Sequence, residues 1–316
     1  MIILGVETSC DETSMAIIKN NLLIAHYTTS SADVQSHYGG VVPEVASRYH
    51  LKNIHHVFQQ VISEAKISPN EITHIVYTNN PGLPGCLHVG KVFSKTLASI
   101  IGAELVPVNH LYGHIFSPYI ESGKPVFPML SVVISGGHSS IYLVNNYEDI
   151  KILNETQDDA LGEVYDKVAR VIGWTYPGGP IIDKNYNESM ATLEFMQPMS
   201  ASAKFSFSGL KTSIINYVHN KKQHNESINP VQIASSFQKF AINDVIKKIK
   251  FVLQQHSDIK CISLGGGVSA NSLLRSEIKK LNIQQIDIPL LKYTGDQAGM
   301  IAYYGNELIK FRKGIN

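Results

Sequence analysis

The chain has 316 residues, of which 44% are hydrophobic and 17% are charged, and this balance excludes a disordered or low-complexity protein. Its 27 basic and 26 acidic residues give a net charge of +1, so the total charge alone does not point to a nucleic acid or a membrane as partner. Three widely spaced cysteines form no disulfide framework, and no signal-peptide pattern or long apolar run is present. We therefore expect a cytoplasmic protein without membrane contact, of a length that suggests two domains.

Two segments of the chain show the same pattern of a strand, a polar turn and a second strand. Residues 2–18 contain two apolar runs separated by small and acidic residues, and residues 129–144 repeat this order. A second pair follows: residues 73–101 and residues 260–281 each run from an apolar strand through a glycine-rich loop into a helical pattern. The repetition predicts an α/β protein made of two related halves that face each other across a cleft.

The spacing of these segments sets the predicted domain boundaries. The first domain is expected at residues 1–125 and the second at residues 126–316. Because the hairpin and the next strand are further apart in the second half, we expect a helical insertion at about residues 150–210. The prediction allows the C-terminal helix to pack back on the first domain.

Glycine-rich turns at these positions favour a nucleotide or phosphate site. Backbone N–H groups of Gly136 and Gly137, which follow Ser135, can approach an anion without side-chain obstruction. A glycine-rich loop that opens a helix adds the positive end of the helix dipole. Asn271, after the run of glycines at 265–267, is suited either to bind a ribose or base or to cap the following helix.

The turn of the first hairpin is unusually acidic. Glu7, Asp11 and Glu12 lie within six residues, and their charges repel one another. A cation, or a phosphate with its Mg²⁺ ion, would relieve this repulsion. An exposed acidic turn in water is the alternative.

Two histidines have the spacing of metal ligands. His110 and His114 stand at i and i+4, on one face of a helix, as zinc and iron sites require of two imidazoles. A chain with 13 histidines produces such a pair by chance often enough that the pair alone proves little. Leu111 stands where a metallopeptidase would have glutamate, which argues against that class. Asp296 is the candidate third ligand, and its alternative is an ordinary helix cap.

Two further patterns favour plain structural roles. Asp159, Glu163 and Asp166 share one face of a predicted helix and are typical of its solvated side. The serine- and glycine-rich residues 204–213 are typical of a surface loop. Residues 204–313 carry 16 basic and 7 acidic side chains, a local excess of 9 that fits either solvated helix faces or a contribution to nucleic-acid binding.

Taken in order, the motifs resemble those of a known family. They are GVETSCDETS, GGVVPEVASRYH, PGLPGCLHVG, NHLYGH, ISGGHS, LGEVYDKVAR, YPGGP, FSFSGLKT, SFQ, GGGVSAN and GDQAGMIA. The chain resembles the tRNA N6-adenosine threonylcarbamoyltransferases, a branch of the actin-like ATPase (ASKHA) superfamily. The resemblance implies two duplicated RNase H-like domains around a central nucleotide cleft.

The resemblance also implies roles for particular residues. His110, His114 and Asp296 match the family's metal ligands, which implies one divalent ion, Fe²⁺ or alternatively Zn²⁺, with Mg²⁺ as a further option beside a nucleotide. Asp11 and Glu12 match the acidic turn and are the candidate catalytic residues. The implied substrate-binding residues are Val133, Ile134, Ser135, Gly136, Gly137, Asp166, Gly179, Asp183 and Asn271. Thr294, Gly295 and Gln297 depart from the family pattern beside Asp296.

The activity implied is transfer of a threonylcarbamoyl group from threonylcarbamoyl-AMP to the N6 amine of adenosine 37 in tRNAs that read codons beginning with A. The implied partners are tRNA, a catalytically inactive paralogue, a P-loop ATPase and the synthase that makes the adenylate. The alternatives are an ATP-dependent kinase or ATPase of the same superfamily, a metallopeptidase, and a non-catalytic nucleotide-binding scaffold. The first turn lacks the glycine of the kinase pattern Asp-x-Gly-Thr, which argues against the kinase.

Overall fold

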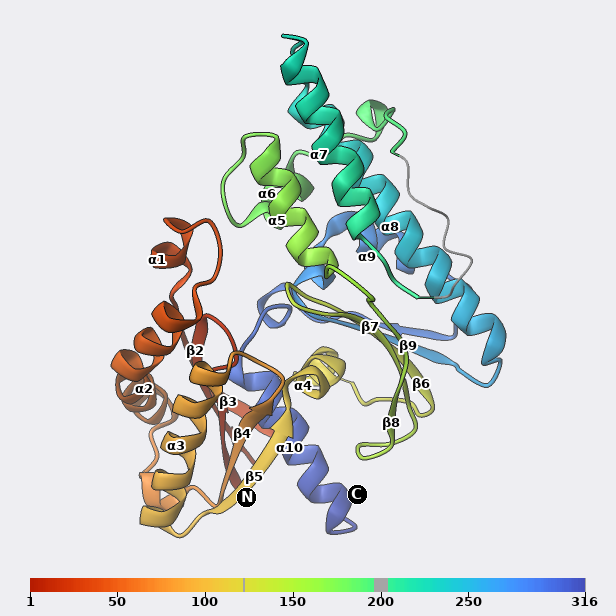
Figure 1. Cartoon of the computed structure of the whole chain (residues 1–316). Coiled ribbons are helices and arrows are strands. Elements are labelled where there is room, and N and C mark those ends of the chain that lie inside the picture. Colours follow the sequence, from red (N-terminus) through yellow and green to blue (C-terminus); the bar gives the residue numbers. More distant parts are fainter. Residues whose placement is uncertain (122, 196–203, 316) are drawn as a thin grey trace. The chain divides into compact units, whose positions relative to one another are not determined.

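The computed structural model describes residues 1–121, 123–195 and 204–315. The chain divides into two compact units: unit 1 is Met1–Pro125 with Pro289–Asn316, and unit 2 is Val126–Ile288 (Figure 1). Within the described residues each unit contains one five-stranded mixed sheet with helices packed on it. The predicted α/β class is therefore confirmed.

The sheet of unit 1 combines an antiparallel hairpin with parallel strands. Its order is β3-β2-β1-β4-β5, in which β1 pairs antiparallel with β2 and parallel with β4. Every residue of β1 is buried, because helices cover both faces of the sheet and an apolar run satisfies both. The strands are β1 (Ile2–Glu7), β2 (Glu12–Lys19), β3 (Leu22–Ser30), β4 (His74–Asn80) and β5 (Glu104–Asn109).

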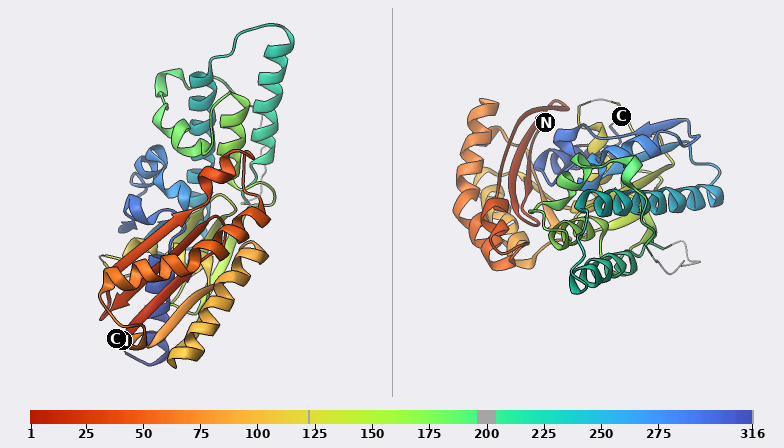
Figure 2. Two further views of the ribbon diagram at one scale, coloured as in Figure 1. Left: turned by 90° about the vertical axis from the view of Figure 1, so that its left-hand side faces the viewer. Right: turned by 90° about the horizontal axis from the view of Figure 1, so that it is seen from above.

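The helices of unit 1 lie on both faces of this sheet. Figure 2 shows α2 and α3 on one side of the strands and α10 on the other. The apolar residues of α2 recur at helical spacing and join the core of the sheet at Ile54, Val57 and Val61. The helices are α1 (Ala32–Ser36), α2 (Pro43–Ala65), α3 (Pro84–Ile101), α4 (His110–Phe116) and α10 (Ala298–Arg312), with short 3-10 turns at Pro69–Glu71, Ser117–Tyr119 and Leu291–Tyr293.

Unit 2 repeats the topology of unit 1. Its sheet order is β10-β9-β6-β7-β8, so β6, β7, β8, β9 and β10 take the places of β1, β2, β3, β4 and β5. The pairing directions also agree, since β6 is antiparallel to β7 and parallel to β9. The strands are β6 (Met129–Ile134), β7 (Ser139–Val144), β8 (Ile150–Glu155), β9 (Cys261–Gly265) and β10 (Gln285–Asp287).

The helices of unit 2 enclose a large apolar core. Four of its described α-helices lie between β8 and β9 in the sequence, and their apolar faces meet around Tyr165, Phe205, Phe207 and Phe237. The helices are α5 (Leu161–Val171), α6 (Gly178–Lys184), α7 (Ser208–Gln223), α8 (Pro230–Gln255) and α9 (Ser272–Ile278), with 3-10 turns at Glu188–Met190 and Gly267–Ala270.

The structure differs from the sequence prediction at the borders of the second half. The predicted second domain runs to residue 316 with the option that its C-terminal helix packs back on the first domain, and α10 does pack on β1 and β2 in unit 1. The predicted insertion begins at residue 150, but residues 150–155 form the edge strand β8. Its residues 196–203 lie outside the described residues.

Two smaller interpretations are wrong. Asp159 precedes α5 and does not lie on its solvated face; its carboxylate accepts from Lys167 Nζ at 2.8 Å and Lys211 Nζ at 2.5 Å. These two bonds, with one from Ser208, hold the pKa of Asp159 low against the effect of burial, which raises it. The segment 204–213 is not a surface loop. Phe205 and Phe207, which precede α7, are fully buried, and the residues from Ser208 onward belong to α7. Alternation of serine with phenylalanine signalled this burial.

No helix in the described ranges is both long and apolar enough to cross a membrane.

Candidate functional site

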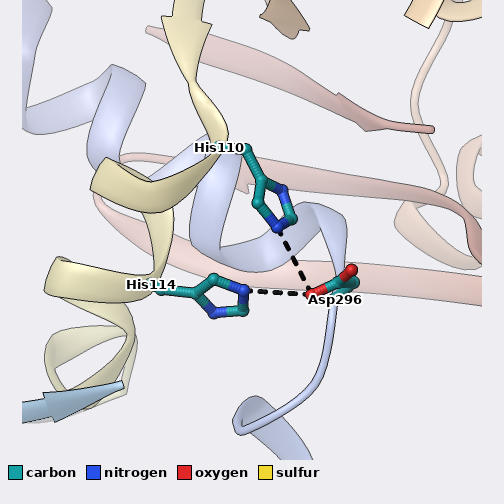
Figure 3. Close-up of side chains that lie close together, drawn as sticks. All are labelled: His110, His114 and Asp296. Atoms are coloured by element: carbon teal, nitrogen blue, oxygen red, sulfur yellow. Dashed lines mark hydrogen bonds and ion pairs between the residues drawn. The ribbon is translucent and has the colours of Figure 1, made fainter. Parts of the chain in front are cut away.

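Three side chains of unit 1 meet at one point. His110 and His114 lie on successive turns of the short helix α4, which Asn109 caps by accepting from the N–H of Leu111. Asp296 lies on the loop that leads into α10 (Figure 3). Its Oδ1 is 3.4 Å from Nε2 of His110 and 3.0 Å from Nε2 of His114. The two histidines are buried and 182 or more residues from Asp296 in the sequence, so only the packing of α10 on unit 1 brings them together.

The alternative role of Asp296 as a helix cap is not observed. Gln297 caps α10, and its side chain accepts from the N–H of Met300. The carboxylate of Asp296 is therefore left to face the histidines. A carboxylate oxygen that faces two imidazole nitrogens is in the position of a metal ligand, whereas a helix cap would face the backbone N–H groups of the helix.

The charges of this cluster depend on one another. Burial lowers the pKa of His110, but the carboxylates of Glu7 and Asp296 raise it well above its ordinary value. Burial raises the pKa of Asp296, and His110 and His114 then hold it well below its usual range. Burial and the positive charge of His110 lower the pKa of His114, which its bond to Asp296 only partly offsets. Without an ion, a proton on His110 balances the two carboxylates.

The residues present fit a divalent metal ion. Two imidazole nitrogens and one carboxylate oxygen lie within 4.8 Å of one another. This donor set suits zinc or iron and leaves coordination positions open. Three protein ligands with open positions are typical of catalytic rather than structural sites. His110, His114 and Asp296 thus form a triad that can hold a metal ion.

The acidic turn between β1 and β2 lies in the same unit. Asp11 is 9% exposed, which excludes the exposed-turn alternative for its side chain. Burial and the charge of Asp11 raise the pKa of Glu12 well above its ordinary value. The main chain of the turn is fixed by α3, since the N–H of Leu83 donates to the carbonyl of Ser9 at 2.8 Å. The side chains of Asp11 and Glu12 are therefore close together, and the carboxyl group of Glu12 favours its neutral form.

The glycine turn of unit 2 presents open backbone. Ser135 to His138 form the turn between β6 and β7, and the N–H of Ser135 donates to the carbonyl of His138 at 2.7 Å. A Cβ atom at Gly136 or Gly137 would meet no atom within 4 Å, so the protein leaves the space beside both residues unfilled. Val133 and Ile134 precede the turn on β6 with fully buried side chains, so any contact with a substrate must be through their main chain.

The other predicted substrate residues lie on the helices of unit 2. Asp166 Oδ1 accepts from the N–H of Gly178 at 2.7 Å, which fixes the start of α6. Gly179 follows there, and its Cβ position is open as well. Asp183 accepts from the N–H of Ser272 at 3.0 Å, so it lies beside Asn271.

Asn271 has a structural role in addition to any binding role. Its Oδ1 accepts from the N–H of Leu274 at 2.9 Å, which confirms the predicted cap of α9. Its amide donates to Gln238 Oε1 at 2.9 Å, and Gln238 donates to Asp183 Oδ1, also at 2.9 Å. Gln238 lies in the motif SFQ, but sequence reasoning gives it no role, because its contacts with Asn271 and Asp183 appear only in the fold. Sequence reasoning also grouped Glu7 with the acidic turn and did not connect it with His110, although an acid at the end of a fully buried strand is a signal of a specific partner.

Comparisons with known proteins give the family. The family model for tRNA N6-adenosine threonylcarbamoyltransferase matches residues 22–303. The chain belongs to this family. A protein of that name from Ureaplasma parvum serovar 3 is 59% identical over 312 residues, which cover 99% of this chain and 97% of the relative. One from Mycoplasmoides gallisepticum is 47% identical over 318 residues and 98% of both chains. The motifs read from the sequence therefore identify the family correctly.

Solved structures show the same fold at low sequence identity. Full-length HypF in a phosphate- and nucleotide-bound form superimposes with a TM-score of 0.61 at 13% identity, covering 98% of this chain and 56% of HypF. Component A of the Acidaminococcus fermentans (R)-2-hydroxyglutaryl-CoA dehydratase gives a TM-score of 0.54 at 14% identity, covering 98% and 99%. The expected fold of two duplicated actin-like ATPase domains is confirmed. The chain is a transferase of a family that acts on tRNA.

Proposed function

We propose that this chain transfers the threonylcarbamoyl group of threonylcarbamoyl-AMP to the N6 amine of adenosine 37 in tRNAs that read codons beginning with A. Family membership supports the reaction. The observation that carries its assignment to this chain is the convergence of His110, His114 and Asp296. In this reaction a new bond joins N6 to the carbamoyl carbon. The bond from that carbon to the phosphate oxygen breaks, and AMP leaves.

In this proposal unit 2 binds the adenylate. The backbone N–H groups of Gly136 and Gly137 donate hydrogen bonds to its phosphate. Asp166 and Asp183, with Asn271 and the main chain at Gly179, hold the ribose and the base. Val133, Ile134 and Ser135 position the glycine turn. The unfilled space beside both glycines supports the assignment, because an anion needs room to approach backbone N–H groups.

Unit 1 holds the metal ion in this proposal, through His110, His114 and Asp296. A bound Fe²⁺, or alternatively Zn²⁺, would act as a Lewis acid on oxygen atoms of the donor. Mg²⁺ beside a nucleotide remains part of the proposal. Asp11 accepts the proton that the attacking amine loses, since an adenine amine is a poor nucleophile until that proton departs. Glu12, with its raised pKa, provides a neutral carboxyl group beside it.

The proposed partners are tRNA, an inactive paralogue of the chain, a P-loop ATPase, and the synthase that produces threonylcarbamoyl-AMP. We assign the reaction to the cytoplasm, where tRNA is modified. Partners of this kind fit a chain with a net charge of only +1, because tRNA binding gains from basic surface that other subunits supply.

The proposal is tested by mass spectrometry of tRNA nucleosides. Purified chain, its paralogue and the P-loop ATPase are mixed with threonylcarbamoyl-AMP and unmodified tRNA in a single turnover. We expect threonylcarbamoyladenosine from the wild type, and a rate at least 100-fold lower from Asp11→Ala, in line with the usual contribution of a general base. Asp33→Ala, on α1, serves as the matched control and should keep the wild-type rate. No modified nucleoside from the wild type contradicts the function, and a wild-type rate from Asp11→Ala contradicts the role of Asp11 alone.

A further inference from the structure

We propose that Glu7 positions His110 for metal binding. Its carboxylate accepts the Nδ1 proton of His110 and so leaves the lone pair of Nε2 directed at the metal site. The inference rests on the proposed metal site and assigns to it a residue outside the ligand triad.

The two nitrogens of His110 face different carboxylates. Nδ1 lies 3.0 Å from Oε2 of Glu7, and Nε2 lies 3.4 Å from Oδ1 of Asp296. A ring held in this way has one nitrogen for the protein and one for the ion. Carboxylates that bind the second nitrogen of a ligating histidine fix its tautomer and raise the basicity of the first.

Glu7 is itself held firmly as an acceptor. The N–H of Ser9 donates to its Oε1 at 2.6 Å, and the hydroxyl of Thr78 donates to its Oε2 at 2.5 Å. Glu7 ends β1 and Thr78 lies on the neighbouring strand β4, so the carboxylate is fixed by the sheet itself. An ionised carboxylate only accepts hydrogen bonds, so the shared proton belongs to Nδ1 of His110.

Glu7 is a buried carboxylate whose partners lie on the following turn, on β4 and on α4. Its side chain is fully buried, and no lysine or arginine of the described residues forms an ion pair with it. A buried carboxylate costs free energy that an apolar residue at the end of β1 would avoid. The nitrogen that faces this carboxylate is Nδ1 of His110, 3.0 Å from Oε2.

The second histidine provides an internal contrast. Nδ1 of His114 is buried and has no hydrogen-bond partner in the described part of the chain. Its ring is placed by the packing of α4, in which His114 is fully buried. The role of Glu7 therefore concerns one ligand of the triad, His110.

The inference is tested by the affinity of the full chain for Zn²⁺, measured by competition with a chromophoric chelator. Glu7→Gln should weaken Zn²⁺ binding 10- to 100-fold, the usual loss for such a partner. The reason is that the glutamine amide can donate to Nδ1, which places a proton on Nε2, where the ion must bind. Glu104→Gln is the matched control, because Glu104 pairs with His74 at 3.2 Å, a histidine outside the triad. It should leave the affinity unchanged.

A double-mutant cycle shows whether Glu7 acts through His110. Glu7→Gln should have little further effect in a His110→Ala background and its full effect in the wild type. Nitrogen-15 spectra of the wild type, which require no substitution, should show a slowly exchanging proton on Nδ1 of His110. Unchanged Zn²⁺ affinity in folded Glu7→Gln protein, or Nδ1 without a proton, overturns the role of Glu7. Failure of the wild type to bind Zn²⁺ would instead overturn the metal site.

Discussion

Two histidines of unit 1 show how the surroundings of a residue set its charge. His110 is fully enclosed, yet two carboxylates raise its pKa. His26, on β3, has two hydroxyl groups as its partners among the described residues: its Nε2 is 3.2 Å from Ser14 Oγ and 3.1 Å from Thr28 Oγ1. Burial and the charge of Lys292 lower the pKa of His26 to about 4. The surroundings of His110 therefore favour its charged form, and those of His26 favour its neutral form.

The low pKa of His26 predicts a loss of stability in acid. The unfolded chain protonates this ring near its ordinary pKa of about 6.5, while the folded chain does so only near 4, so stability is present above 6.5 and is lost as the pH falls toward 4. At pH 5 the expected loss is about 2 kcal/mol. Urea unfolding followed by circular dichroism at pH 7.5 and pH 5 measures it.

His26→Asn should remove this part of the pH dependence. His55→Asn, an exposed position on α2, is the control and should behave as the wild type does. If His26→Asn loses as much stability between the two pH values as the control, the account of His26 is wrong.

For single residues, the sequence indicates which side chains are reactive but not which of them lie close together in the folded chain. The spacing of His110 and His114 suffices to predict their common helix face, and family resemblance favours Asp296 as the third ligand over its alternative as a helix cap. Helix capping by Gln297 rather than by Asp296 depends on the backbone at the start of α10 and has no signal in the spacing. The contact of Glu7 with His110 joins residues 103 apart and is visible only in the fold.

Among the elements, the hairpins and the strand–loop–helix segments are where the sequence predicts best. Both hairpins and both later strands form as expected, because runs rich in β-branched residues that are bounded by small and polar turn residues leave few alternatives. The edge strand β8 is missed, since its mixture of polar and apolar residues is half-exposed and does not read as a buried run. The segment before α7 is missed because serine and glycine favour a loop, although the alternation of Phe205 and Phe207 with serine indicates burial.

Gly266 connects β9 with the 3-10 turn at Gly267–Ala270, and its backbone conformation can be tested by substitution. Gly266 has φ +84° and ψ 163°, a region that other residues avoid, and a Cβ there would lie 2.4 Å from the carbonyl oxygen of Ile134. Gly266→Ala should lower the free energy of unfolding of unit 2 by about 2 kcal/mol. The single tryptophan, Trp174, packs on the core of unit 2, so its fluorescence during urea unfolding reports this unit.

Gly267→Ala is the matched control for Gly266. Nothing lies within 4 Å of its Cβ position, so the change should stay within about 0.5 kcal/mol. Equal stability of the two alanine variants would contradict the strain argued for Gly266.

For the whole molecule, repetition in the sequence is the strongest signal. Two sheets of one topology follow from the repeated order of strand, turn, strand and later loop. The sequence leaves open which unit α10 joins, because its apolar residues would suit either sheet. In the structure α10 packs on unit 1. That packing carries Asp296 to the histidines, so the metal site depends on it.

The most direct test of the central claim is the yield of threonylcarbamoyladenosine from metal-free and metal-reloaded protein. The chain is stripped with a chelator, then assayed with donor, tRNA and partners before and after addition of Fe²⁺ or Zn²⁺. We predict no product from stripped protein, recovery on reloading, and no recovery in the variant with both His110→Ala and His114→Ala. Undiminished product from verified metal-free protein, or from that double variant, would contradict the account.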